Sequence, residues 1–206
     1  RAFCAGADLS GFSDRPEDRY DNYRARYNAR KNRLMFTYVK DYTKPVISAV
    51  EGYALGGGFE LAMFGDFIIA GEAAQFGLPE GRHSLIPGAG GTQNLPRIIG
   101  AALAKELIWT ARRISAEEAL GHRIVNHVTP KGKALAKARE IVEQMSKIGP
   151  LSIMMTKQSI DRGLDMSLAQ GFQQEADLAY LLTWSDDRKE GLTAFAERRP
   201  AKFKGQ

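Results

Sequence analysis

The sequence predicts an α/β fold with a helical region at its C-terminal end. Between residues 44 and 89, short apolar runs alternate with glycine and proline, and the runs at 46–50 and 67–70 are rich in β-branched and aromatic residues with little polar alternation. That pattern is typical of strands buried on both faces of a parallel sheet. After about Ser115 the apolar residues recur at helical spacing instead.

Composition places the chain among ordinary globular proteins. Of its 206 residues, 44% are hydrophobic and 26% are charged, which suits a domain with a sizeable core. No run approaches the roughly 18 to 20 apolar residues of a membrane span, and no signal peptide is visible. The single cysteine, Cys4, excludes an intramolecular disulfide and favours a reducing compartment. We interpret it as a small buried hydrophobe, because no activating base can be assigned to it.

The α/β core is predicted from a strand, a glycine turn, a short helix and a second strand in close succession. Apolar runs rich in β-forming residues place the two strands at 46–50 and 67–70, and the helix is expected between them, at 57–64. This succession is the crossover arrangement that joins parallel strands. A last strand is expected at 125–128, preceded by a helix that Ser115 and Glu118 open as a capping box.

The C-terminal third is predicted to be a helical region. Apolar residues at helical spacing indicate a stripe on its first helix, formed by Leu135, Ala138, Ile141, Val142 and Met145. Four helices are expected, at about 132–148, 151–163, 167–184 and 187–199. We therefore divide the chain into an α/β core at 1–130 and a helical region at 131–206.

Two basic parts of the chain leave the kind of anionic partner open. The formal charge is +5, and most of it lies in 188–206, where six Lys and Arg meet two Glu. Such a tail suits the phosphates of a small molecule or of nucleic acid, or is a solvated helix face. In 14–38, an arginine-rich segment, one helix face would carry Tyr20, Tyr23, Tyr27 and Leu34. This pattern fits nucleic acid, but we favour an amphipathic surface helix because acidic residues are interspersed.

Three consecutive glycines, Gly56, Gly57 and Gly58, stand before the predicted helix and are followed by Glu60. Glycine allows a close approach to the main chain, and the first N–H groups of a helix lack intrahelical partners and favour negative charge. Phosphate fits poorly, because the Lys-Ser or Lys-Thr of a phosphate loop and the G-x-G-x-x-G spacing are both missing. The turn therefore predicts an N–H donor to a developing oxyanion, with Glu60 as a proton-transfer group beside it.

A second donor and a second carboxylate complete this hypothesis. The small-residue turn at 4–8 offers another N–H group, and Glu80 follows the strand after the Glu60 helix. Two amide donors with one ionised and one protonated carboxylate suit the addition or removal of water at a double bond next to a carbonyl. Taken singly, each glutamate would be interpreted as a solvated surface charge.

The motifs around these residues resemble the crotonase superfamily and, within it, the enoyl-CoA hydratases. They are FCAGADL at 3–9, KPV at 44–46, GYALGGGFELA at 52–62, FGLPE at 76–80 and IPGAGGTQ at 86–93. The resemblance implies a crotonase-like (ClpP/crotonase) α/β fold, a spiral of ββα units with a C-terminal helical region. Similar proteins usually carry several tens of residues before the position of Ala2. The first strands are therefore expected to be missing from this chain, which would leave a sheet edge unpaired.

The resemblance also assigns the site residue by residue. Ala7 and Gly57 match the backbone donors to a thioester oxygen, and Glu60 and Glu80 match the two catalytic glutamates that hold a water. The implied substrate-binding positions are Ala5, Asp8, Leu9, Gly88, Phe195 and Arg198. The last two match positions that reach the CoA nucleotide of a neighbouring subunit in similar enzymes. Ser10 replaces a frequent CoA-binding lysine, and the polar loop at 81–84 suggests an acyl group with a polar end.

These matches predict a 2-enoyl-CoA hydratase of the kind used in fatty acid β-oxidation. The alternatives are a Δ3,Δ2-enoyl-CoA isomerase or another acyl-CoA enzyme of the superfamily, and, from a different class, an RNA-binding hydratase-like protein. The resemblance implies no cofactor beyond the coenzyme A of the substrate, a homotrimer or dimer of trimers, and no membrane association. It also implies the cytoplasm of a bacterium or the mitochondrial matrix of a eukaryote. No metal is expected, because ligand spacing is missing at His83, His122 and His127.

Overall fold

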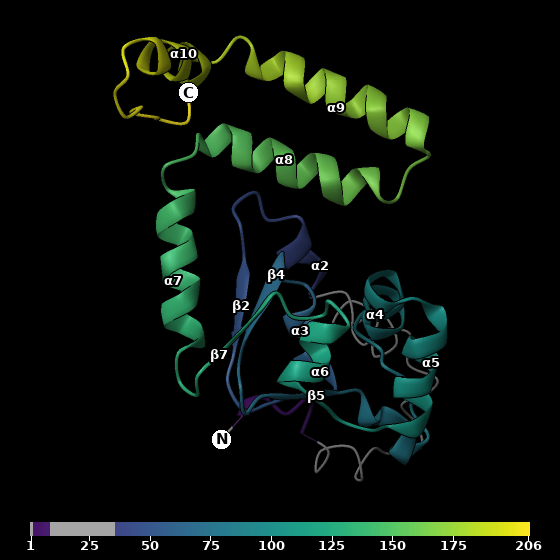
Figure 1. Cartoon of the computed structure of the whole chain (residues 1–206). Coiled ribbons are helices and arrows are strands. Elements are labelled where there is room, and N and C mark those ends of the chain that lie inside the picture. The colour runs from purple at the N-terminus through teal and green to yellow at the C-terminus, as the bar shows by residue number, and fades with distance from the viewer. Residues whose placement is uncertain (1, 9–35) are drawn as a thin grey trace. The chain divides into compact units, whose positions relative to one another are not determined.

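The computed structural model of the chain describes residues 2–8 and 36–206 (Figure 1). Contacts divide these residues into two units. The first unit holds 2–8, 36–41 and 46–138, and the second holds 42–45 and 139–206. Leu9, Ser10 and the tyrosine face predicted in 14–38 lie outside the described residues. The domain division after residue 130 also stays a prediction.

The first unit is built on two sheets of mainly parallel strands. One has the order β1–β3–β5–β6, with β5 and β6 antiparallel, and the other has the order β2–β4–β7 with parallel pairs. The strands are β1 Ala2–Cys4, β2 Ile47–Val50, β3 Tyr53–Leu55, β4 Phe67–Gly71, β5 Gln75–Gly77, β6 Ile114–Ser115 and β7 His127–Thr129. The chain alternates between the two sheets from β1 to β5, as a spiral of ββα units does.

Helices and a buried apolar core complete this unit. The helices are α2 Thr37–Lys40, α3 Gly57–Ala62, the 3-10 helix η3 Pro79–His83, α4 Gly91–Ile99, α5 Ala101–Thr110, α6 Ala116–Gly121 and the start of α7 Ala134–Met145, whose residues from 139 on belong to the second unit. The rings of Phe59 on α3 and Phe76 on β5 pack at a centroid distance of 5.4 Å in a tilted arrangement that aromatic pairs favour. Val50, Leu78 and Leu95 are buried in the same core cluster, so α3 is held firmly between strands and α4.

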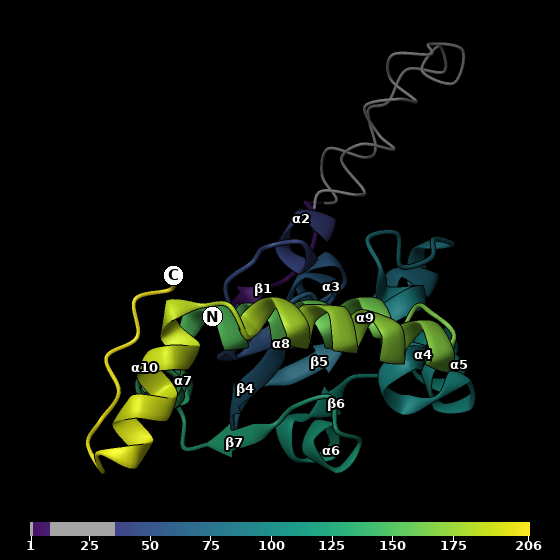
Figure 2. The same ribbon diagram turned by 90° about the horizontal axis from the view of Figure 1, so that it is seen from above.

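The second unit is helical. Its helices are α8 Pro150–Gly163, α9 Leu168–Leu182 and α10 Asp186–Ala196. Helices α8 and α9 lie side by side in both views (Figures 1 and 2). Their chains come close at two small residues, because a Cβ added to Gly171 would lie 3.9 Å from the Cα of Gly163. No helix in residues 36–206 combines the length and hydropathy needed to cross a membrane.

The buried strands and the helix that carries Glu60 are confirmed close to their predicted bounds, as β2, β4 and α3. Strand β3, which lies between β2 and α3, was not predicted, and neither were β5, η3, α4 and α5, which follow β4. Strand β3 has three residues, which is too short for a periodic signal. Pro96 inside α4 and glycines at both of its ends obscure a helical pattern there.

Predictions about two helices, α7 and α6, need correction. The apolar stripe of α7 is only partly covered, because Ala138 is buried while Leu135 and Val142 are 55% and 50% exposed. Ser115 does cap α6, since its hydroxyl accepts the N–H of Glu118 at 3.1 Å. The Glu118 side chain instead binds Arg112 at 2.7 Å, because a charge-assisted hydrogen bond is stronger than a return bond to the backbone. The capping box is therefore half formed.

We expect Gly58→Ala to destabilise the protein. A Cβ at this position would overlap the backbone of Cys4, so β1 or α3 would have to move, at a cost of about 1–3 kcal/mol in unfolding free energy. Chemical denaturation followed by circular dichroism measures the effect. Gly121→Ala is the matched control, because nothing lies within 4 Å of its Cβ position. Equal stability of the two variants would contradict the close approach of β1 and α3.

Candidate active site

The three glycines before α3 serve three different purposes. Gly56 has φ +55° and ψ −130°, a conformation that is open to glycine and strained for other residues. Gly58 leaves no room for a side chain, because the Cys4 carbonyl lies against it. At Gly57, in contrast, an added Cβ would meet only Glu60 Oε2, at 4.0 Å. Gly57 therefore faces an open space beside a carboxylate.

The two predicted backbone donors lie close together. Gly57 is the first residue of α3, where N–H groups have no acceptor within the helix. The turn after β1 packs against it: Gly6 has φ +96°, and a Cβ there would lie 3.0 Å from Leu55 O and 3.5 Å from Gly57 N. Ala7 follows directly and is exposed. The structure thus packs the turn that carries Ala7 against the first residue of α3.

Glu60 is a buried carboxylate that the main chain holds in position. Its side chain is only 2% exposed, and its Oε1 accepts the N–H groups of Ala89 and Gly91, each at 2.8 Å. A buried charge is tolerated when such donors replace water. The other oxygen, Oε2, is the atom that faces Gly57. One oxygen is therefore used for anchoring, and the other points toward the predicted oxyanion donors.

Glu80 stands opposite this carboxylate, in η3. Its Oε1 lies beside Gly56, where an added Cβ would be 3.2 Å away. Its Oε2 is buried and accepts no hydrogen bond from the described residues. Burial raises the pKa of Glu80 above 4.5, and the negative charge of Glu60 raises it further, although the residue's own backbone N–H opposes the shift. Glu80 therefore holds a proton more readily than an ordinary glutamate does.

The two glutamates thus occupy different environments within one site. Glu60 receives two N–H donors, which stabilise a negative charge, whereas Glu80 has an oxygen without a donor, which disfavours a negative charge. A pair of carboxyl groups with such opposed surroundings is suited to act as one base and one acid. With two N–H groups beside them, the pair can move protons at a substrate whose oxygen gains negative charge.

The predicted positions differ in how the structure places them. Ala5, Asp8 and Gly88 are exposed residues of the same unit as the glutamates, and Gly88 lies next to Ala89, a Glu60 donor. Phe195 and Arg198 belong to the second unit, and Leu9 lies outside the described residues. The two donors to Glu60 were missed. Their signal was the glycine-rich turn at 86–93, which we assigned to lining the reaction centre rather than to anchoring a carboxylate.

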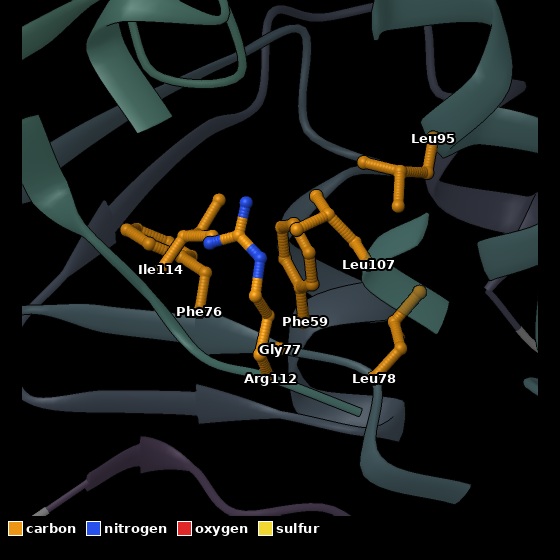
Figure 3. A pocket seen from close by; sticks show the side chains of 8 residues that line it. All are labelled: Phe59, Phe76, Gly77, Leu78, Leu95, Leu107, Arg112 and Ile114. Atoms are coloured by element: carbon orange, nitrogen blue, oxygen red, sulfur yellow. The ribbon is translucent and has the colours of Figure 1, made fainter. Parts of the chain in front are cut away.

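A small apolar pocket is lined by Phe59 of α3 and does not include the two carboxylates (Figure 3). Its lining is Phe59, Phe76, Gly77, Leu78, Leu95, Leu107, Arg112 and Ile114. Phe59 precedes Glu60 and packs on the core side of α3, so this pocket is a packing space of the core. Figure 3 shows the Arg112 guanidinium among these apolar side chains, where Glu118 pairs with it at 2.7 Å.

No group of three or more His, Cys, Asp or Glu side chains in residues 2–8 and 36–206 is placed to hold a metal ion. Of the three histidines, His122 lies 3.7 Å from the Glu118 carboxylate, and His83 and His127 are exposed.

Comparison with known proteins identifies the family of the chain. A family model described as Enoyl-CoA hydratase/isomerase matches residues 1–206. The chain belongs to this family. It is 42% identical over 203 residues to the probable enoyl-CoA hydratase 2, mitochondrial, of Arabidopsis thaliana, covering 98% of this chain and 66% of that protein. It is 37% identical over 206 residues to the 2,3-dehydroadipyl-CoA hydratase of Escherichia coli K12, covering 100% and 78%.

Solved structures of the family confirm the predicted fold. The crystal structure of an enoyl-CoA hydratase from Bacillus anthracis has a TM-score of 0.89 and 42% identity to this enoyl-CoA hydratase/isomerase family member, covering 98% of this chain and 77% of that one. The crotonase-like α/β fold with a C-terminal helical region is therefore confirmed. The chain spans just under two thirds of the length of the Arabidopsis relative and about three quarters of the other two.

The raised pKa of Glu80 predicts a pH dependence of stability. A carboxyl group with a higher pKa in the folded than in the unfolded protein holds its proton more tightly when folded. Its contribution to stability is therefore fully present below about pH 4.5, the ordinary pKa of a glutamate, and is lost as the pH rises through the raised pKa of the folded protein. We expect Glu80→Gln to remove this loss, so that the variant gains stability relative to wild type over that interval. Urea denaturation at a series of pH values measures the difference.

The control for this experiment is Glu143→Gln, which removes an exposed glutamate on α7 and should leave the pH dependence unchanged. Parallel stability curves for wild type and Glu80→Gln from pH 4 upward would show that burial does not affect the Glu80 carboxyl group.

Proposed function

We propose that the protein is a 2-enoyl-CoA hydratase, which adds water across the 2,3 double bond of an enoyl-CoA thioester. The observation that carries the proposal is the pairing of two glutamates with opposed surroundings beside Gly57. Glu60 is anchored by two N–H groups, whereas Glu80 has a buried oxygen without a donor among the described residues and a pKa that burial raises. The family resemblance implies that relatives with isomerase, decarboxylase or dehalogenase chemistry commonly lack or replace one of these glutamates, so the presence of both favours hydration.

The proposed mechanism assigns a step to each group. The N–H groups of Ala7 and Gly57 bind the thioester oxygen and stabilise the enolate, each contributing about 10²- to 10³-fold in rate. Glu60, through Oε2, takes a proton from the water whose oxygen bonds to the β-carbon. Glu80 gives its proton to the α-carbon of the enolate, which restores the thioester carbonyl. The proton that Glu60 gains balances the one that Glu80 loses, so the net change is the addition of one water.

The substrate is proposed to be an acyl-CoA, with no cofactor beyond its coenzyme A. Ala5, Asp8, Leu9 and Gly88 would line its path, and Phe195 and Arg198 would contact the CoA nucleotide. The loop at 81–84, which follows Glu80, is exposed and polar. Together with the name of the Escherichia coli relative, this loop supports an acyl chain that ends in a polar group. Relatives named as mitochondrial and relatives from bacteria support the mitochondrial matrix or the bacterial cytoplasm as its location.

We expect the protein to consume crotonyl-CoA and 2,3-dehydroadipyl-CoA, seen as loss of the absorbance of the conjugated thioester. Glu60→Gln and Glu80→Gln should each lower kcat by about a hundredfold or more, since each removes an essential acid or base. Glu143→Gln serves as the control and should keep wild-type activity. A higher kcat/KM for the dehydroadipyl thioester would support the polar acyl end, and activity on plain chains alone would count against it.

A folded protein that is inert on both thioesters would overturn the hydratase proposal. Conversion of a 3-enoyl-CoA to the 2-enoyl isomer would then identify the isomerase of the same family. Salt-dependent binding of RNA that survives loss of both glutamates would instead favour the RNA-binding alternative.

The second unit exposes large apolar side chains, which mark interfaces when they gather in one region. They include Ile160, Leu164, Leu168, Phe172, Tyr180, Leu181 and Trp184. We propose that these helices assemble the protein into a homotrimer or a dimer of trimers, as the family resemblance implies.

Sedimentation equilibrium should therefore give a mass of three or six chains. Trp184→Lys, which places a charge on the proposed interface, should shift the mass toward one chain. Trp109→Lys is the matched control, because Trp109 is 77% exposed and Trp184 is 75% exposed, and Trp109 lies on α5 of the first unit. A monomeric wild type would contradict the proposal.

A further inference from the structure

The C-terminal end of α10 carries an arginine where helices usually place glycine. Arg198 has φ +55°, and its N–H donates to Phe195 O at 3.2 Å while Arg199 N donates to Ala194 O at 3.0 Å. These two bonds form the Schellman motif, whose left-handed position favours glycine because a side chain is strained there. A side chain retained at a strained position indicates a use for that side chain.

The neighbouring Arg199 is fully engaged in ion pairs. Its guanidinium forms two parallel bonds with Glu190, at 2.6 and 2.9 Å, and a third with Glu197. Glu190 Oε1 also accepts the N–H of Lys202 at 2.8 Å. These donors lower the pKa of Glu190 to about 2, so its carboxylate stays charged at neutral pH. We call the contacts of Glu190 with Arg199 and Lys202 the Glu190 clamp. Glu190 thus fixes the chain on the C-terminal side of Arg198.

Arg198 itself is left available. Among the described residues its side chain forms no hydrogen bond or ion pair. Phe195, which its N–H contacts, is 85% exposed. The exposed ring of Phe195 offers a stacking face and the guanidinium of Arg198 offers a phosphate-binding cation, the two groups that recognise a nucleotide. Two adjacent arginines therefore have separate tasks, one internal and one outward.

The rest of the tail is anchored independently of this clamp. The buried carboxylate of Asp187 accepts the N–H groups of Lys204 and Gly205 at 2.6 and 2.8 Å. The ring of Phe203 packs where Cβ atoms on Gly149 and Gly191 would lie 3.7 and 3.4 Å from it. Loss of the Glu190 clamp should therefore disturb the turn at 197–202 without releasing the tail.

We propose that Glu190 and Arg199 are positioning residues, which hold the turn so that Arg198 presents its guanidinium to a phosphate group of the CoA nucleotide. The inference rests on the proposed function, in which Phe195 and Arg198 contact that nucleotide. Glu190 acts only through Arg199 and the Lys202 backbone, and it takes no part in the chemistry at Glu60 and Glu80.

Steady-state kinetics with two thioesters tests the inference in the full chain. For crotonyl-CoA, Glu190→Gln should raise KM by about five- to tenfold, the effect of loosening one charge-assisted contact, with kcat unchanged. For crotonyl-pantetheine, which lacks the nucleotide, it should change neither constant. Glu143→Gln is the control, since it removes a comparable charge without a clamp. An equal rise in KM for both thioesters, or a fall in kcat, would overturn the proposal in favour of a general structural role.

Arg198→Gly separates ligand binding from folding. Glycine relieves the left-handed strain, so the melting temperature should hold or rise, while KM for crotonyl-CoA rises as in Glu190→Gln. In this background Glu190→Gln should add nothing, because residues that act through one contact are not additive. Full additivity, or an unchanged KM in Arg198→Gly, would show that Glu190 does not act through Arg198.

Calorimetric titration with free coenzyme A keeps this test independent of hydratase activity. If the protein binds coenzyme A and Glu190→Gln weakens binding, the positioning role stands even for an enzyme that does not hydrate enoyl-CoA. If wild type binds coenzyme A no more tightly than pantetheine, the turn does not recognise the nucleotide and the inference fails.

Discussion

The site depends on the two hydrogen bonds that Ala89 and Gly91 donate to Glu60. They satisfy one oxygen of a carboxylate that is almost completely buried, and they tie the turn before α4 to the helix α3. A buried charge without such donors would cost several kcal/mol. Because the donors are main-chain groups at fixed positions, the same bonds that make burial tolerable also aim the free oxygen at Gly57. The same two hydrogen bonds therefore stabilise the buried carboxylate and orient its other oxygen.

The environment of Glu80 follows from that arrangement. The Glu60 carboxylate is close enough to raise the pKa of Glu80, and one buried Glu80 oxygen has no donor among the described residues. Burial and this repulsion both raise the pKa of Glu80, which supports the proposed roles of Glu60 as base and Glu80 as acid. The proposed oxyanion donors beside them follow two turns whose positive φ angles, at Gly6 and Gly56, favour glycine.

The C-terminal tail also contains a carboxylate that fixes the main chain next to a side chain proposed to bind a ligand. Glu190 uses two oxygens for Arg199 and Lys202, and a strained turn carries Arg198 outward. Exposed ion pairs contribute little to stability. Their value in this turn is geometric, because a bidentate arginine pair fixes orientation as well as distance.

The sequence by itself determined the family, the α/β class and the residue types of the site, because motifs such as GGGFE and FGLPE carry their chemistry in order and spacing. It also located β2, β4 and α3, whose apolar runs are long enough for a periodic signal. Strands of two or three residues, such as β3 and β6, lack that signal and form only because a neighbouring strand pairs with them. Only the tertiary structure decided which glutamate receives N–H donors and which is left without one. The donors come from a turn about thirty residues away in the chain, and local sequence carries no information about a contact that folding creates.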